Sequence, residues 1–98
     1  MASDLGILRR DDFGLTEAYT GPRTSTESDL AGVWQRAMGL DRVGIHDSFF
    51  ALGGKSFSAA VIFGEIEQRY GVRLPMAVLL ELQTVAQLSD KIDELSRQ

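Results

Sequence analysis

Apolar residues recur at helical spacing in several stretches of this chain. The first stretch follows Thr24–Glu27, a Thr-x-x-Glu sequence that has the form of a capping box and predicts a helix start. One helical face then carries apolar residues three and four positions apart: Leu30, Val33, Trp34, Ala37 and Met38. Gly39 is typical of a helix end, so the first helix is predicted to run to about this residue.

Two further long helices are predicted in the same way. Ser56 opens a segment of about four turns that is closed by Gly71. The apolar face of this segment consists of Ala59, Ile62, Phe63, Ile66 and Tyr70. Thr84–Gln87 is a second capping box, and a C-terminal helix should follow it. The apolar stripe of that helix consists of Val85, Leu88, Ile92 and Leu95.

A brief helix and a long loop complete the pattern. Pro75 suits a first helical turn, which predicts a brief helix from roughly Met76 to Glu81. From Leu40 to Lys55 glycines break the period, so this stretch is predicted to be a loop. Its apolar residues are too many to leave in water, so the loop should pack onto the domain, anchored by Phe49 and Phe50. These apolar residues are Val43, Ile45, Phe49, Phe50 and Leu52.

No stretch shows the strict alternation of a half-buried strand. The predicted fold is therefore an all-α four-helix bundle, with three longer helices, one short helix and a long loop between the first and second helices. Within the second helix, Gly64 lowers helix stability by up to about 1 kcal/mol relative to alanine. One explanation for a glycine at this position is that it permits the close approach of another helix. Residues 1–21 show no sustained period and are predicted to be a leader or linker, poorly ordered or partly helical. Residues 22–98 are predicted to be the domain.

Composition excludes several classes of protein. The 98 residues are 44% apolar and 24% charged, as in an ordinary globular protein of one domain. A net charge of −4 with scattered basic residues argues against a nucleic-acid surface. The absence of cysteine excludes thiolate chemistry, and with His46 as the one histidine an enzyme is the least supported class. No apolar run reaches the roughly 20 residues that cross a bilayer and no secretory pattern is present, so we expect no membrane association and a cytoplasmic protein.

The sequence Gly53-Gly54-Lys55-Ser56 is the candidate for chemistry. A phosphate-binding P-loop would need a glycine at position 49 and a preceding strand, but Phe49 stands there and no strand is predicted. Two glycines before a helix would let the backbone turn sharply and leave the Ser56 hydroxyl uncovered. Taken alone, these residues indicate no more than a turn and a serine N-cap.

The longer sequence Asp47–Phe57, DSFFALGGKSF, resembles the signature of peptidyl carrier proteins, the thiolation domains of nonribosomal peptide synthetases. That signature is an acidic residue, two aromatics, Leu-Gly-Gly, a variable polar residue, the modified serine and an apolar residue. The matching positions are Asp47, Phe49, Phe50, Leu52, Gly53, Gly54, Ser56 and Phe57. The similarity extends over about residues 22–96, in register with the predicted helices.

The resemblance implies that Ser56, flanked by Gly54 and Lys55, carries a 4′-phosphopantetheine arm transferred from coenzyme A by a phosphopantetheinyl transferase. A helix N-terminus favours the phosphodiester. The thiol of the arm would hold an aminoacyl or peptidyl group as a thioester. The implied protein is a monomeric carrier and not an enzyme. Its partners would be an adenylation enzyme or domain and condensation, tailoring or thioesterase enzymes of antibiotic biosynthesis.

Some residues around the signature have two interpretations. The family more often has His, Asp or Asn at the position of Lys55. Lys55 either contacts the phosphate or an acidic partner residue, or is an ordinary solvated lysine. Four apolar residues form either a docking surface for partners or peripheral core: Phe57, Val61, Met76 and Val78. Asp47 is expected to cap a short turn in the loop.

Two other functions stay open. An acyl carrier of polyketide or fatty-acid synthesis shares the arm and the bundle, although its motif usually reads Asp-Ser-Leu. An unmodified helical interaction module is the other alternative. The sequence names neither the cargo nor the final product, and it is compatible both with a free-standing protein and with a domain of a larger synthetase.

Overall fold

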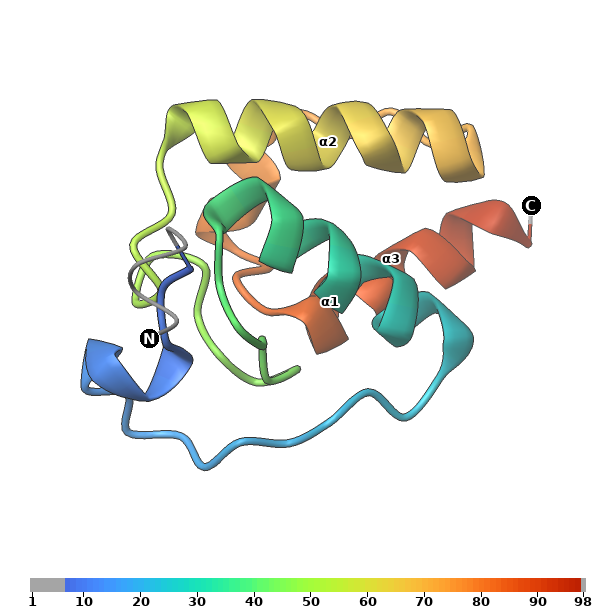
Figure 1. The fold of residues 1–98 in the computed structure, drawn as a ribbon. Helices are drawn as coiled ribbons and strands as arrows, with labels where there is room; N and C mark the ends of the chain where they lie inside the picture. The colour runs from blue at the N-terminus through green and yellow to red at the C-terminus, as the bar shows by residue number, and fades with distance from the viewer. Residues whose placement is uncertain (1–6, 98) are drawn as a thin grey trace.

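The computed structural model describes residues 7–97, which form three α-helices joined by turns and irregular segments (Figure 1). The helices are α1 (Ser25–Met38), α2 (Ser56–Tyr70) and α3 (Val85–Ser96). Two short 3-10 helices accompany them, η2 (Arg10–Phe13) and η3 (Met76–Leu80). Over residues 7–97 the chain forms no strand, and a single isolated bridge pairs Leu8 with Leu40. The predicted all-α class is therefore confirmed.

The two predicted capping boxes each begin a helix, with one difference from the expected geometry. The Thr24 and Thr84 hydroxyls accept hydrogen bonds from the backbone N–H groups of Glu27 and Gln87, at 3.1 and 3.2 Å. The Glu27 carboxylate accepts from the N–H of Arg23 at 2.7 Å, one residue before the cap. The Gln87 side chain likewise accepts from the N–H one residue before its cap, at 3.0 Å. Each helix start is thereby tied to the chain that leads into it.

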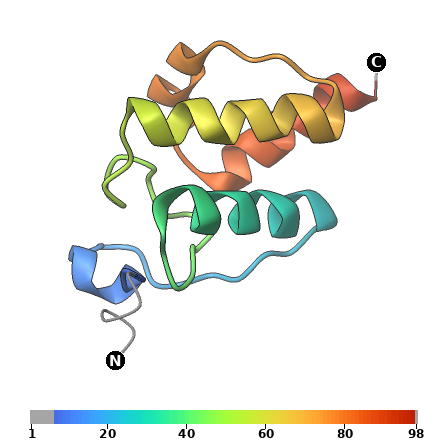
Figure 2. The same cartoon turned by 45° about the horizontal axis from the view of Figure 1, so that its top comes forward.

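The three α-helices enclose one core. α1 and α2 run antiparallel side by side, and α1 also packs against α3 (Figures 1 and 2). Trp34 of α1 is fully buried, and its ring forms an edge-to-face pair with the Phe49 ring, with 5.6 Å between centroids. The connection between α1 and α2 contributes Val43, Ile45, Phe49 and Leu52 to this core. Burial of these side chains holds the connection down, as their number predicted.

The prediction that Phe49 and Phe50 both anchor the loop is wrong for Phe50. Its side chain is 46% exposed, and its ring forms an edge-to-face pair with the Phe49 ring, with 5.4 Å between centroids. Consecutive residues in this turn point in different directions, so only Phe49 enters the core. Phe50 is left at the surface.

The structure does not support the explanation of Gly64 by a close approach of another helix. Apart from its two chain neighbours and the backbone of α2 itself, a Cβ built at this residue would meet no described atom within 4 Å. Gly64 therefore lies on the open face of α2. The predicted brief helix is present as η3, in 3-10 rather than α form, and contacts α2. Among the described helices, none combines the length and the apolar character needed to cross a membrane.

Residues 7–23, which include η2, form a strap along the connection between α1 and α2 (Figure 1, dark blue to cyan). The Leu8 N–H donates to the Gly39 carbonyl at 2.7 Å, and the Leu8 carbonyl accepts from Asp41 at 2.8 Å. Farther along, the Thr20 carbonyl accepts from the Ile45 N–H at 2.9 Å. The first six residues of the predicted leader lie outside the described residues, and the boundary at residue 21 stays a prediction.

Candidate functional site around Ser56

Two glycines shape the turn that leads to Ser56, for different reasons. Gly53 has φ +82°, in the left-handed region that favours glycine. Gly54 has ordinary φ, but a Cβ on it would overlap the ring of Phe49. The turn is closed by hydrogen bonds from the N–H of Gly53 to the Phe50 carbonyl at 3.0 Å and from Gly54 to the Phe49 carbonyl at 2.9 Å. Only the first glycine supplies the sharp backbone turn expected from the sequence.

Ser56 is the first residue of α2, and it is exposed. The N-cap is Lys55, in extended conformation with φ −134° and ψ 174°, so the interpretation of Ser56 as an ordinary N-cap is wrong. Within the described chain no side chain caps this end of α2, whereas α1 and α3 each begin at a capping threonine. The first backbone N–H groups of a helix have no intrahelical partner, and the helix dipole favours an anion there. The start of α2 is therefore suited to a phosphate group on the Ser56 oxygen.

A mostly apolar hollow of about 320 Å³ lies beside Ser56. It separates the turn and the first residues of α2 from η3, and its described lining is Phe49, Phe50, Lys55, Ser56, Ala59, Met76, Leu79 and Leu80. Lys55 is the one charged residue of this lining. The sequence did not predict the hollow, because Phe50 and Leu80 had no pattern that assigned them to the surface.

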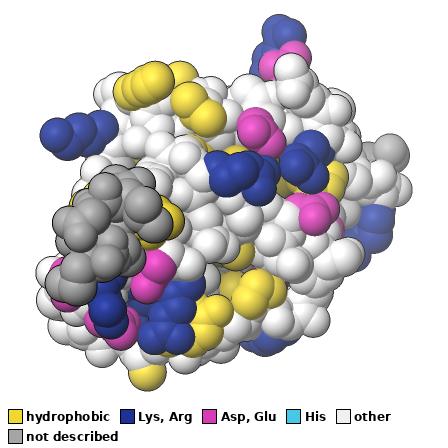
Figure 3. Space-filling view, viewed as in Figure 1, with side chains coloured by type: hydrophobic (Ala, Val, Ile, Leu, Met, Phe, Trp, Pro, Cys, Tyr) yellow, Lys and Arg dark blue, Asp and Glu magenta, His cyan; other side chains and the backbone are white. Residues whose placement is uncertain are grey.

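Exposed apolar side chains gather around the same end of α2. Phe57 is 72% exposed, Leu80 69% and Met76 46%, and Val61 is exposed one turn after Phe57. Figure 3 shows apolar side chains grouped over the first turns of α2, with a basic side chain projecting beside them. Val78 differs from the predicted set, because it packs partly buried against the core next to Leu79. Leu80 takes its place among the exposed residues.

Asp47 begins the signature and is fully buried. Its carboxylate accepts a hydrogen bond from the Gly44 N–H at 2.8 Å, so the predicted capping of a short turn is confirmed. The same carboxylate binds the guanidinium of Arg10 in the strap, a contact that the sequence did not predict. His46, in contrast, is exposed. Within residues 7–97, no group of carboxylate and histidine side chains is arranged to hold a metal ion.

The region that contains this site matches a known family and known structures. Residues 28–92 match the family model described as the phosphopantetheine attachment site. Surfactin synthase subunit 3 of Bacillus subtilis (strain 168) is 39% identical over 83 residues, which are 85% of this chain and 6% of that protein. The chain therefore spans a small part of this curated relative.

Two solved structures are similar in fold and in sequence. The solution structure of an active-site mutant peptidyl carrier protein superposes with a TM-score of 0.78 at 32% identity, over 83% of this chain and 90% of that chain. A peptidyl carrier protein solved in complex with the phosphopantetheine transferase Sfp and coenzyme A gives a TM-score of 0.75 at 33% identity. That match covers 78% of this chain and 99% of the other.

Proposed function

This chain belongs to the phosphopantetheine attachment-site family, and on that premise we propose that Ser56 is the residue that carries the arm. Members of the family are carriers with a covalent phosphopantetheine, and they act with separate catalytic partners. The observation that carries the proposal is the position of Ser56, exposed at the uncapped start of α2 and inside the matched residues. Gly54 and Lys55 complete the attachment site by shaping the turn and by placing a cation next to the serine.

Attachment requires a phosphoryl transfer that this chain does not catalyse by itself. A bond forms between Ser56 Oγ and the phosphorus that bears the pantetheine part of coenzyme A, and the pyrophosphate bond of coenzyme A breaks. Adenosine 3′,5′-bisphosphate leaves, and the serine proton passes to a base of the transferase. The exposed N–H groups at the start of α2 and the Lys55 ammonium would stabilise the resulting phosphodiester. The arm then supplies a thiol that holds the cargo as a thioester.

We further propose that the cargo is an aminoacyl or peptidyl group of nonribosomal peptide synthesis, including antibiotic biosynthesis. The identity to a surfactin synthase subunit and the likeness to peptidyl carrier proteins support this over the acyl carrier of polyketide or fatty-acid synthesis. The proposed partners are a phosphopantetheinyl transferase, an adenylation enzyme or domain, and condensation, tailoring or thioesterase enzymes. The Sfp complex of a similar carrier supports the first of these.

The finer description of the carrier is part of the same proposal. We count η3 as the fourth helix of a carrier bundle over residues 22–98 that acts as a monomer, with residues 1–21 as leader or linker. Its compartment would be the cytoplasm, where coenzyme A is available. Partners would dock on an apolar surface formed by Phe57, Val61 and Met76. We add Leu80 and Phe50 to this surface because they are exposed around the same hollow, and we leave out Val78.

Intact-mass spectrometry tests the proposal directly. The parent chain, Ser56→Ala and the control Ser58→Ala are each incubated with coenzyme A, magnesium and a transferase of broad specificity. We expect the parent and Ser58→Ala to gain the mass of one phosphopantetheine, and Ser56→Ala to gain none. A folded parent that gains nothing, or a Ser56→Ala variant that still gains the arm, would contradict the assignment of Ser56.

A further inference from the structure

The strap contains a buried arginine whose contacts reach the loop that carries Ser56. Arg10 is 5% exposed, and its side chain donates two parallel hydrogen bonds to Asp47, from Nε at 2.6 Å and from Nη2 at 2.8 Å. Nη2 also donates to the Glu17 carbonyl at 2.6 Å, and Nη1 to Asp11 at 3.1 Å. All three guanidinium nitrogens therefore have partners, and a paired geometry of this kind is specific in direction as well as strong.

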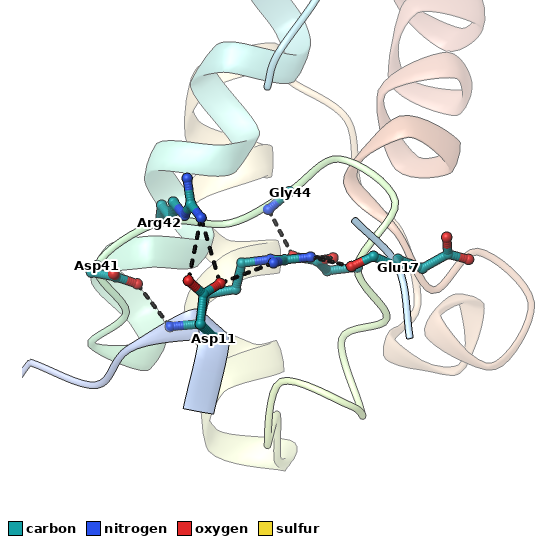
Figure 4. A network of polar contacts seen from close by, with 7 residues as sticks. Asp11, Glu17, Asp41, Arg42 and Gly44 are labelled. Atoms are coloured by element: carbon teal, nitrogen blue, oxygen red, sulfur yellow. Dashed lines mark hydrogen bonds and ion pairs between the residues drawn. The ribbon is translucent and has the colours of Figure 1, made fainter. Parts of the chain in front are cut away.

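The other side of this contact is the turn at the start of the signature. The Asp47 carboxylate that binds Arg10 also accepts from the Gly44 N–H (Figure 4), and the Asp47 N–H donates to the Gly44 carbonyl at 3.1 Å. Gly44 is buried so close to this carboxylate that a Cβ would come within 2.9 Å of Asp47 Oδ2. Arg10, Asp47 and Gly44 thus form one packed unit. The strap is tied to this turn through the Asp47 carboxylate.

The strap reaches the far end of the same loop through a second side chain. Phe13 packs against the core, and its Cε2 atom lies 3.2 Å from the place of a Cβ on Gly53. Asp47 is the first residue of the signature, and Gly53 stands three positions before Ser56. The strap therefore touches the loop at both ends of the segment that delivers Ser56 to the start of α2.

We propose that Arg10 is a positioning residue for Ser56, which acts by holding Asp47 and, together with Phe13, sets the conformation of the loop from Asp47 to Ser56. This inference rests on the proposed attachment of the arm at Ser56. Buried ion pairs contribute little net stability, but their strict geometry can select one conformation. The strap is then part of the attachment site, although it lies outside residues 28–92, where the family model matches.

The test compares Arg10→Ala and Arg10→Lys with the parent in two measurements, kcat/KM for arm transfer and the backbone amide spectrum of Gly53, Gly54 and Ser56. We expect Arg10→Ala to shift these amides and to lower kcat/KM by about tenfold, since small misplacement of a reacting group slows transfer steeply. Arg10→Lys should restore part of the rate, because lysine keeps the charge without the two parallel hydrogen bonds. In a protein that already carries Asp47→Asn, Arg10→Ala should have almost no further effect on kcat/KM, because the two residues act as one pair.

Controls separate positioning from loss of fold. Arg42→Ala removes a different arginine that contacts the strap, from the connection between α1 and α2. Arg42 lies over the Tyr19 ring at 4.1 Å and contacts Asp11, and its removal should leave transfer and the loop amides near the parent. If Arg10→Ala does not fold, Phe13→Ala is measured in its place. This variant removes the contact of the strap with Gly53 and keeps the ion pair between Arg10 and Asp47. Unchanged loop amides and unchanged transfer in a folded Arg10 or Phe13 variant would overturn the inference. The amide spectrum decides this even if the parent takes no arm, a result that would count against the proposed function instead.

Discussion

Gly54 lies directly against the ring of Phe49, so closely that a Cβ on Gly54 would overlap the ring. Phe49 is buried between Trp34 and Phe50, so its ring has little freedom to move away. Gly54→Ala should therefore destabilise the protein by about 1–3 kcal/mol, the usual cost of an overpacked core. Denaturant unfolding measures this loss. Arm transfer should slow as well, because the displaced turn leads straight to Ser56.

Gly64→Ala is the matched comparison, because it makes the same change at a helical glycine with open space around it. Apart from its chain neighbours and the backbone of α2 itself, nothing described lies within 4 Å of the new Cβ, and alanine is the better helix former. The free energy of unfolding should rise by about 0.5–1 kcal/mol, with arm transfer as in the parent. A loss of stability would mean that the face of α2 around Gly64 is packed and not open.

Features with local signals in the sequence could be predicted, whereas contacts between distant residues could not. Helix starts and ends follow from local signals, such as Thr24 with its capping bond, and the core face of α1 follows from the spacing around Trp34. The signature marks Ser56 because its residues are contiguous. The sequence offered no equally local signal for the contact of Arg10 with Asp47, 37 positions apart in a chain with many charges of both signs.

Irregular segments set a second limit on prediction. Phe49 and Phe50 are adjacent aromatics in a turn without any period, so the pattern could not assign one to the core and the other to the surface. The same holds in η3, where Val78 turned inward and Leu80 outward. The hollow beside Ser56 depends on these two choices. It therefore became visible only once the three-dimensional arrangement was known.

The exposed apolar residues beside Ser56 predict a separation of stability from partner binding. Phe57→Ala and Leu80→Ala remove side chains that are mostly in contact with water, so the free energy of unfolding should change by about 0.5 kcal/mol or less. If partners dock there, kcat/KM for arm transfer should fall severalfold. Gln68→Ala, an exposed change farther along α2, should have no effect on either quantity. Transfer that is unchanged in both apolar variants would remove Phe57 and Leu80 from the docking surface.

Lys55 predicts a dependence of arm transfer on ionic strength. Lys55 stands directly between Gly54 and Ser56, the residue to which the phosphate would be attached. Lys55→Ala should slow transfer at low salt, and the difference from the parent should shrink at high salt because exposed charges are screened. Lys55→Arg should behave like the parent, since it keeps the positive charge. Initial rates that are equal for Lys55→Ala and the parent at low salt would identify Lys55 as an ordinary solvated lysine.

Glu27 predicts how stability changes with pH. The hydrogen bond from Arg23, with backbone N–H groups adding to it, lowers the pKa of the buried Glu27 carboxyl below its ordinary value of 4.5 despite burial. Because the folded pKa is lowered, the ionised form adds stability that is complete above pH 4.5 and is lost as the pH falls through the folded pKa. Urea unfolding at a series of acidic pH values measures this loss. Glu27→Gln should flatten that part of the profile, whereas Glu94→Gln, at an exposed pair with Lys91, should keep the slope of the parent. If the plots of stability against pH run parallel for Glu27→Gln and the parent, Glu27 titrates alike in the folded and unfolded chains. The tie between Arg23 and the start of α1 would then add no stability.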